Sequence, residues 1–203
     1  MTDELMQVRY QPFDYQCLKS LFAAYRFPRN KISKLLNRGE IIALKSGLYV
    51  LSKRYGQNLI PEQVANLLYG PSYVSLDYAL SHYGLIPERA FQVTSVTTGR
   101  KKRFDTEVGS YTYQHLKPGY YSHSYMVQSG EGFSYLIATA EKALCDKLYL
   151  APKLGDITCL EQYLFDDLRV DFRLLAGLDK ALIQHLARIS GKHNLRMLME
   201  MMK

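Results

Sequence analysis

The sequence has few cysteines and no segment hydrophobic enough to cross a membrane. Its three cysteines, Cys17, Cys145 and Cys159, are widely spaced and form no Cys-x-x-Cys pair, so we expect buried reduced thiols and neither zinc ligands nor disulfides. No apolar run approaches the roughly 18 residues that a membrane-spanning helix needs. The first residues lack the basic start and apolar core of a signal peptide. A chain of 203 residues, 47% hydrophobic and 22% charged, therefore indicates a globular protein of the cytoplasm.

Groups that would carry out catalysis are also sparse. Glycine-rich phosphate loops are missing, and no two of the five histidines have the spacing of helical metal ligands. Glu141 and Asp146 are five residues apart on an expected helix, about 140° around its axis, so they do not share a face. Asp105 and Glu107 flank an expected turn. We therefore expect no catalytic residues, no metal and no cofactor. An enzyme that processes nucleic acids remains an alternative.

Acidic residues are nearly missing from one stretch of the chain. Between Lys19 and Arg54 there are nine basic residues and one acid, Glu40, which gives these residues a net charge of +8. The whole chain carries +7, so the remainder is close to neutral. Positive charge concentrated in this way is typical of a surface that binds a polyanion.

The same stretch has the pattern of a helix followed by a β-hairpin. Apolar Ile32, Leu35 and Leu36 recur at helical spacing, and Gly39 can end the helix. Two β-forming segments, 41–44 and 48–51, flank a Lys-Ser-Gly turn. This order predicts the recognition helix and wing of a winged helix-turn-helix. Asp14 is expected to cap the helix that precedes them.

DNA binding is the function that this pattern favours. Asparagine and lysine can bond base edges in the major groove, and serine, lysine and arginine can hold phosphates. A solvated basic face without a ligand is the alternative. An anionic membrane is not favoured as the partner, since the helix has only three apolar positions. The predicted DNA-binding residues are Arg29, Asn30, Lys31, Ser33, Lys34, Asn37, Arg38, Lys45 and Ser46.

The pattern divides the chain into two parts. We expect a DNA-binding domain over residues 1–53, a linker over 54–62 and an α+β domain over 63–203. Only about 13 residues precede the first expected helix, so a further N-terminal helix would be short, irregular or absent. In the second part we expect helices near 61–70 and 75–83, an antiparallel sheet within 91–137, and C-terminal helices near 139–150, 160–165, 178–189 and 193–202.

A second basic cluster follows a strand of this expected sheet. It consists of Arg100, Lys101, Lys102 and Arg103. These residues could form a solvated loop, or they could make a second contact to nucleic acid or to a partner.

Longer motifs carry a family resemblance. The segments 65–76, 78–89, 93–97 and 138–146, together with the Lys-Ser-Gly-Leu-Tyr-Val turn, resemble the AbiEi-type antitoxin and transcriptional regulator family of type IV abortive-infection toxin–antitoxin systems. The resemblance covers about residues 13–150.

This resemblance implies a winged-helix domain followed by a mixed α/β domain. It also implies repression of the protein's own operon through inverted repeats in double-stranded DNA. The functional partner would be a nucleotidyltransferase-type toxin, counteracted without a stable complex. The alternative is a stand-alone regulator or adaptor whose second domain has another partner.

Overall fold

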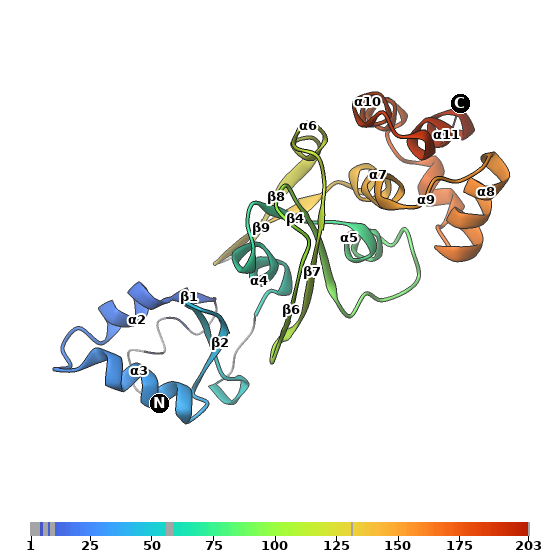
Figure 1. Cartoon of the computed structure of the whole chain (residues 1–203). Coiled ribbons are helices and arrows are strands. Elements are labelled where there is room, and N and C mark those ends of the chain that lie inside the picture. The colour runs from blue at the N-terminus through green and yellow to red at the C-terminus, as the bar shows by residue number, and fades with distance from the viewer. Residues whose placement is uncertain (1–4, 6–7, 9–10, 56–58, 131, 203) are drawn as a thin grey trace.

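The computed structural model describes residues 5, 8, 11–55, 59–130 and 132–202. Ten α-helices occur within these residues, together with a three-stranded and a six-stranded sheet. The small sheet and its helices lie at one end of the molecule, in blue in Figure 1. The large sheet lies in the middle and the C-terminal helices lie at the other end. The fold is therefore α+β, as predicted.

The N-terminal module, residues 13–51, contains two helices and three strands. Its three strands are antiparallel in the order β1-β3-β2, so the last strand lies between the other two. In chain order the elements are β1 (Phe13–Asp14), α2 (Tyr15–Leu21), α3 (Pro28–Asn37), β2 (Ile41–Lys45) and β3 (Leu48–Leu51).

Local sequence signals explain where these elements begin and turn. Asp14 caps α2 as predicted, because its carboxylate accepts a hydrogen bond of 2.7 Å from the Cys17 amide. Pro28 starts α3, where its missing N–H costs nothing. Gly39 and Gly47 have φ of +59° and +80°, which glycine adopts without strain. The prediction that a further N-terminal helix would be short, irregular or absent concerns residues 1–12, most of which lie outside the described residues. Leu5 and Val8, which are described, are buried.

The six-stranded sheet is mixed, and the prediction of an antiparallel sheet was wrong. Its order is β6-β7-β5-β4-β9-β8, and the pairs β4·β9 and β5·β7 are parallel. Alternation of apolar residues locates a strand but does not set the direction of its neighbour. The strands are β4 (Ser72–Val74), β5 (Val93–Thr97), β6 (Lys102–Thr106), β7 (Gly109–His115), β8 (Tyr125–Gly130) and β9 (Phe133–Ala138).

Helices cover this sheet and form the C-terminal end. The short helix α6 lies within the segment 91–137, in which a sheet was expected, because Pro118 begins a helical turn that buries Tyr120 and Tyr121. The linker predicted over 54–62 overlaps a 3-10 turn, η1 (Lys53–Tyr55), and α4 begins inside the predicted linker. The remaining elements are α4 (Pro61–Leu68), α5 (Leu76–His82), α6 (Pro118–Tyr121), α7 (Ala140–Leu150), α8 (Ile157–Glu161), the π-helical η2 (Gln162–Asp167), α9 (Phe172–Ala176), α10 (Lys180–Ser190) and α11 (His193–Met201).

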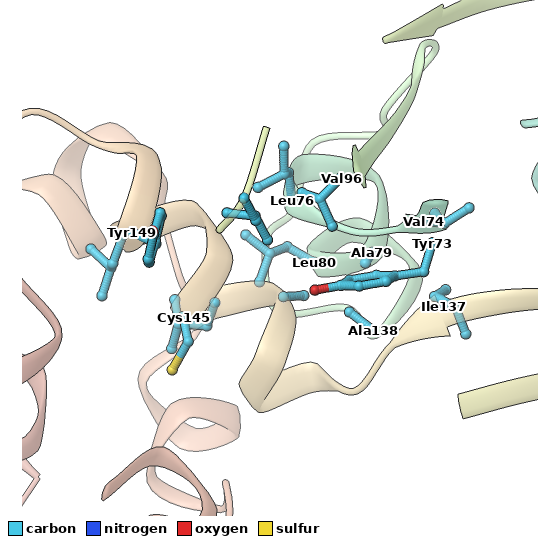
Figure 2. Close-up of a cluster of buried hydrophobic side chains, with 14 of the residues drawn as sticks. Tyr73, Val74, Leu76, Ala79, Leu80, Val96, Ile137, Ala138, Cys145 and Tyr149 are labelled. Atoms are coloured by element: carbon cyan, nitrogen blue, oxygen red, sulfur yellow. The ribbon is translucent and has the colours of Figure 1, made fainter. Parts of the chain in front are cut away.

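Two hydrophobic clusters hold the fold together. The smaller one lies between α2, α3 and the small sheet and includes Leu18, Ile32 and Leu35. The larger one fills the second module, and Figure 2 shows part of it around Tyr73. The larger cluster also includes three residues of the β2–β3 hairpin, Leu44, Leu48 and Val50. The hairpin therefore packs against the second module.

Within the described part of the chain, no helix has the length and apolarity to span a membrane. Among the same residues, no three histidine, cysteine or acidic side chains come together as a metal site.

Candidate nucleic-acid interface

Helix α3 has one buried face and one exposed polar face. Ile32 and Leu35 are only 3% exposed and pack into the smaller cluster. The opposite face contains no acidic residue, and its side chains have no carboxylate within the helix to neutralise them. The exposed residues here, all of them among the predicted DNA contacts, are Arg29, Asn30, Ser33, Lys34, Asn37 and Arg38.

Of the basic residues near the C-terminal end of α3, Arg54 bonds to the helix and Arg38 does not. The Arg54 guanidinium donates hydrogen bonds of 3.0 and 3.2 Å to the carbonyl oxygens of Arg38 and Gly39. A cation at a helix C-terminus also interacts favourably with the helix dipole. Arg38 lies 3.8 Å from Glu40 but is 69% exposed, so this ion pair contributes little and leaves the guanidinium accessible. Arg54 therefore acts on the helix, whereas Arg38 faces solvent.

Lys31 differs from the other predicted contacts on α3. It is half-buried, and its ammonium lies 5.1 Å from the centroid of the Tyr25 ring and 5.9 Å from that of Phe22. These distances are within the range of cation–π attraction. Lys31 therefore links α3 to the segment that follows α2, in addition to contributing charge.

Lys45, at the tip of the hairpin, bonds to the second module. Its ammonium donates hydrogen bonds of 2.8 and 2.7 Å to the carbonyl oxygens of Leu67 and Leu68, at the C-terminus of α4. Burial lowers the pKa of Lys45, and nearby Lys102 lowers it further. The sequence analysis assigned Lys45 to DNA binding. Nothing in the neighbouring sequence indicated that its partner is a carbonyl 22 residues further along the chain. Ser46 is exposed beside it.

The second basic cluster is less available than its sequence suggests. Arg103 forms a two-bond ion pair with Asp105, with distances of 2.8 and 3.0 Å, which lowers the pKa of that carboxyl. The Lys102 ammonium lies 4.9 Å from the centroid of the Tyr69 ring. Arg100 and Lys101 are exposed where the chain enters β6. Tyr69 directly follows Leu68, whose carbonyl oxygen accepts a hydrogen bond from Lys45, so Lys102 lies near the residues that hold the hairpin.

A buried ion pair in the second module was not anticipated. The ammonium of Lys142 lies 2.6 Å from Asp146, and both side chains are fully buried. Asp146 also accepts hydrogen bonds from the hydroxyls of Ser75 and Tyr73, at 2.7 and 3.1 Å. Figure 2 shows the Tyr73 hydroxyl directed toward α7. Ser75 occupies the N-cap position of α5, but its hydroxyl bonds Asp146 and does not cap the helix.

Desolvation lowers the pKa of Lys142 and raises that of Asp146, and their mutual attraction opposes both shifts. The spacing of four residues on one helix was a signal that could have revealed this pair. Because the pair is fully enclosed, its geometry fits a structural role.

A polar cavity of about 360 Å³ lies between the sheet and two helices of the second module. The Lys147 ammonium and the Asp77 carboxylate, 2.6 Å apart, form part of its wall. Thr94 and Thr112 line it from the sheet, and Lys101 contributes a cation.

In comparisons with known proteins, no protein-family model matches this chain and no curated protein matches it.

Proposed function

We propose that residues 13–51 are a winged helix-turn-helix that binds double-stranded DNA, with α3 as the recognition helix and the β2–β3 hairpin as the wing. The observation that carries this proposal is the exposed face of α3, which presents polar and basic side chains without an acidic one. The element order and the strand order β1-β3-β2 support it. A helix of ten residues is about 15 Å long, enough to lie in a major groove about 12 Å wide.

The proposal assigns different roles to different side chains. Asn30 and Asn37 read base edges, because a side-chain amide can bond adenine with two hydrogen bonds. Arg29, Lys34 and Arg38 hold phosphates and supply the salt-dependent part of the affinity. Ser33 and Ser46 bond phosphate or base edges from the helix and the hairpin.

The other predicted contacts have a secondary place in the proposal. Lys31 and Lys45 add positive charge near the DNA, although each already has an intramolecular partner. Arg100 and Lys101 extend the basic surface beyond the hairpin, which would lengthen the contact along the DNA backbone.

We further propose that the protein represses its own operon at inverted repeats and serves as the antitoxin of a type IV system. This part rests on the resemblance of segments 65–89 and 138–146 to the AbiEi-type family. The second module would counteract a nucleotidyltransferase-type toxin without forming a stable complex with it. The protein would then be a regulator and not an enzyme.

A test separates the two parts of this proposal in one cell. The protein is expressed with a reporter under its own upstream region and with the toxin encoded beside it. The Lys34→Ala/Arg38→Ala variant should lose repression and keep at least part of the rescue. The Lys153→Ala/Lys180→Ala variant, which removes the same charge from exposed sites in the second module, should retain both. Repression by the first variant would contradict the DNA-binding assignment, and failure of wild type to rescue would contradict the antitoxin role.

A regulator that senses a small molecule is the second candidate. The polar cavity beside Asp77 and Lys147 favours it, because its volume of about 360 Å³ lies in the range of ligand sites. A nucleotidyltransferase reading frame beside the gene supports the antitoxin role over this alternative. Metal-dependent cleavage of DNA or RNA would instead support a nucleic-acid-processing enzyme.

A further inference from the structure

The two edges of the six-stranded sheet differ in chemistry. Strand β6 forms one edge and carries the charged residues Lys102, Arg103 and Asp105. Strand β8 forms the other edge, and none of its six residues is charged. Charged side chains on an edge strand are a common protection against pairing with another chain. The β6 edge has this protection and the β8 edge lacks it.

The hydrogen bonds of the β8–β9 hairpin show which backbone groups face outward. The Thr139 amide donates to the Ser124 carbonyl at 3.1 Å, so these residues form a hydrogen-bonded pair. Pairs of this kind alternate along an antiparallel ladder. Met126 and Gln128 therefore bond β9 in the regular register. The amides and carbonyls of the intervening residues point to the free edge, and these are Tyr125, Val127 and Ser129.

Side chains leave this edge open. All six residues of β8 are exposed, and Val127, at 64%, is the most exposed of its large apolar residues. The Tyr125 ring stacks on Tyr73 at 4.8 Å between centroids, which ties the first residue of the strand to the sheet. The strand thus combines a fixed position with an accessible backbone.

We propose that β8 pairs with β8 of a second copy of this chain, antiparallel and about a twofold axis at Val127. The amide and carbonyl of Val127 would then bond those of Val127 in the partner. Tyr125 would pair with Ser129 of the partner, and Met126 would lie opposite Gln128 of the partner. The two six-stranded sheets would become one continuous sheet across the dimer.

The composition of β8 suits pairing with a second copy about a twofold axis. In such a contact, residues at equal distances on either side of the axis face each other. A charged residue near the axis would therefore lie close to the same residue of the partner and be repelled by it. The absence of charge from 125–130 removes that repulsion. The three outward-facing residues are centred on Val127, so the same register satisfies both strands. This proposal does not rest on DNA binding.

A contact through one strand is small, so we expect a reversible dimer with a Kd of roughly 1–100 µM. Sedimentation velocity of the full chain over a range of micromolar concentrations should show a shift from monomer to dimer. Val127→Lys should abolish this shift, because it places two like charges at the axis. Val127→Thr, which is β-branched and uncharged, should retain it. Ile189→Lys, at an exposed aliphatic position on α10, should also retain it.

Amide hydrogen exchange gives a second readout at the strand itself. The amides of Tyr125, Val127 and Ser129 should become protected as the protein concentration rises. Those of Met126 and Gln128 should be protected at every concentration, because they bond β9. A chain that stays monomeric at all concentrations would overturn the proposal and leave this edge to a strand of another protein. A dimer unaffected by Val127→Lys would overturn it as well, by placing the interface elsewhere.

Discussion

The two modules differ in whether their basic side chains have acidic partners. In the second module, several basic side chains have an acid or an aromatic ring as a partner within the chain. These pairs are Lys142 with Asp146, Lys147 with Asp77, Arg103 with Asp105, Arg169 with Glu88, and Lys102 with the Tyr69 ring. In the N-terminal module, Glu40 is the only acid between Lys19 and Arg54, and the basic face of α3 is exposed. A surface with many basic and few acidic side chains attracts an anionic binding partner.

The largest effect is expected from the buried pair. Lys142→Ala should lower the free energy of unfolding by about 3–5 kcal/mol, because it leaves the Asp146 carboxyl buried without its cation. The double variant Lys142→Met/Asp146→Leu should lose less, because no charge is then left unpaired. Denaturant unfolding monitored by circular dichroism measures both. Equal losses in the single and double variants would contradict a coupled pair.

The exposed face of α3 should give the opposite result. Replacing Arg29, Lys34 and Arg38 together with alanine should change the free energy of unfolding by at most about 0.5 kcal/mol. Affinity for duplex DNA should fall roughly 100-fold at low salt, and the slope of log K against log salt should flatten by about three. Fluorescence anisotropy titrations measure this. A large loss of stability would mean that these side chains serve the fold.

Base reading should be separable from phosphate binding. Asn30→Ala or Asn37→Ala should cost about 1–3 kcal/mol of discrimination at one base pair, if that amide bonds adenine with two hydrogen bonds. Selection of binding sites from random duplexes would show relaxed preference at that position, with the salt slope unchanged. Unaltered preference in both variants would assign sequence reading to other residues.

Lys45 tests whether a basic residue at the hairpin tip serves the DNA or the fold. Lys45→Ala removes hydrogen bonds to two carbonyls of α4 and should lower the free energy of unfolding by about 1–2 kcal/mol. Chemical denaturation measures this. An unchanged stability with a flatter salt slope would restore its assignment as a phosphate contact.

The smallest effect is expected at Arg103. Because its guanidinium pairs with Asp105 on an exposed strand, Arg103→Ala should change DNA affinity less than twofold and stability by at most about 1 kcal/mol. The same titrations used for α3 measure this. A tenfold loss of affinity would show that the ion pair opens when DNA binds.

Sequence reasoning succeeded where the signal was local. The period of Ile32 and Leu35 gave the buried face of α3, and Gly39 and Gly47 gave its end and the hairpin turn. It failed where contacts join distant segments. Nothing near Lys45 in the sequence indicates the carbonyls of Leu67 and Leu68, and no local pattern fixes which strands run parallel.

Other failures came from weak or overlooked local signals. The helix α9 (Phe172–Ala176) was missed, since five residues are too few to show a period. The Lys142–Asp146 pair had a visible spacing, but lysine and aspartate four apart are usually solvated on a helix surface. Only the burial of α7 shows that this pair lies in the interior.

The measurement that tests the central claim most directly is the salt dependence of binding between the full chain and duplex DNA that carries its own upstream region. If the face of α3 and the residues beside it neutralise three to five phosphates, log K should fall with log salt with a slope of roughly −3 to −5. The Arg29→Ala/Lys34→Ala/Arg38→Ala variant should have a slope near zero to −2. A slope that is shallow in wild type, or equally steep in this variant, would contradict the assignment of α3 as the DNA-binding surface.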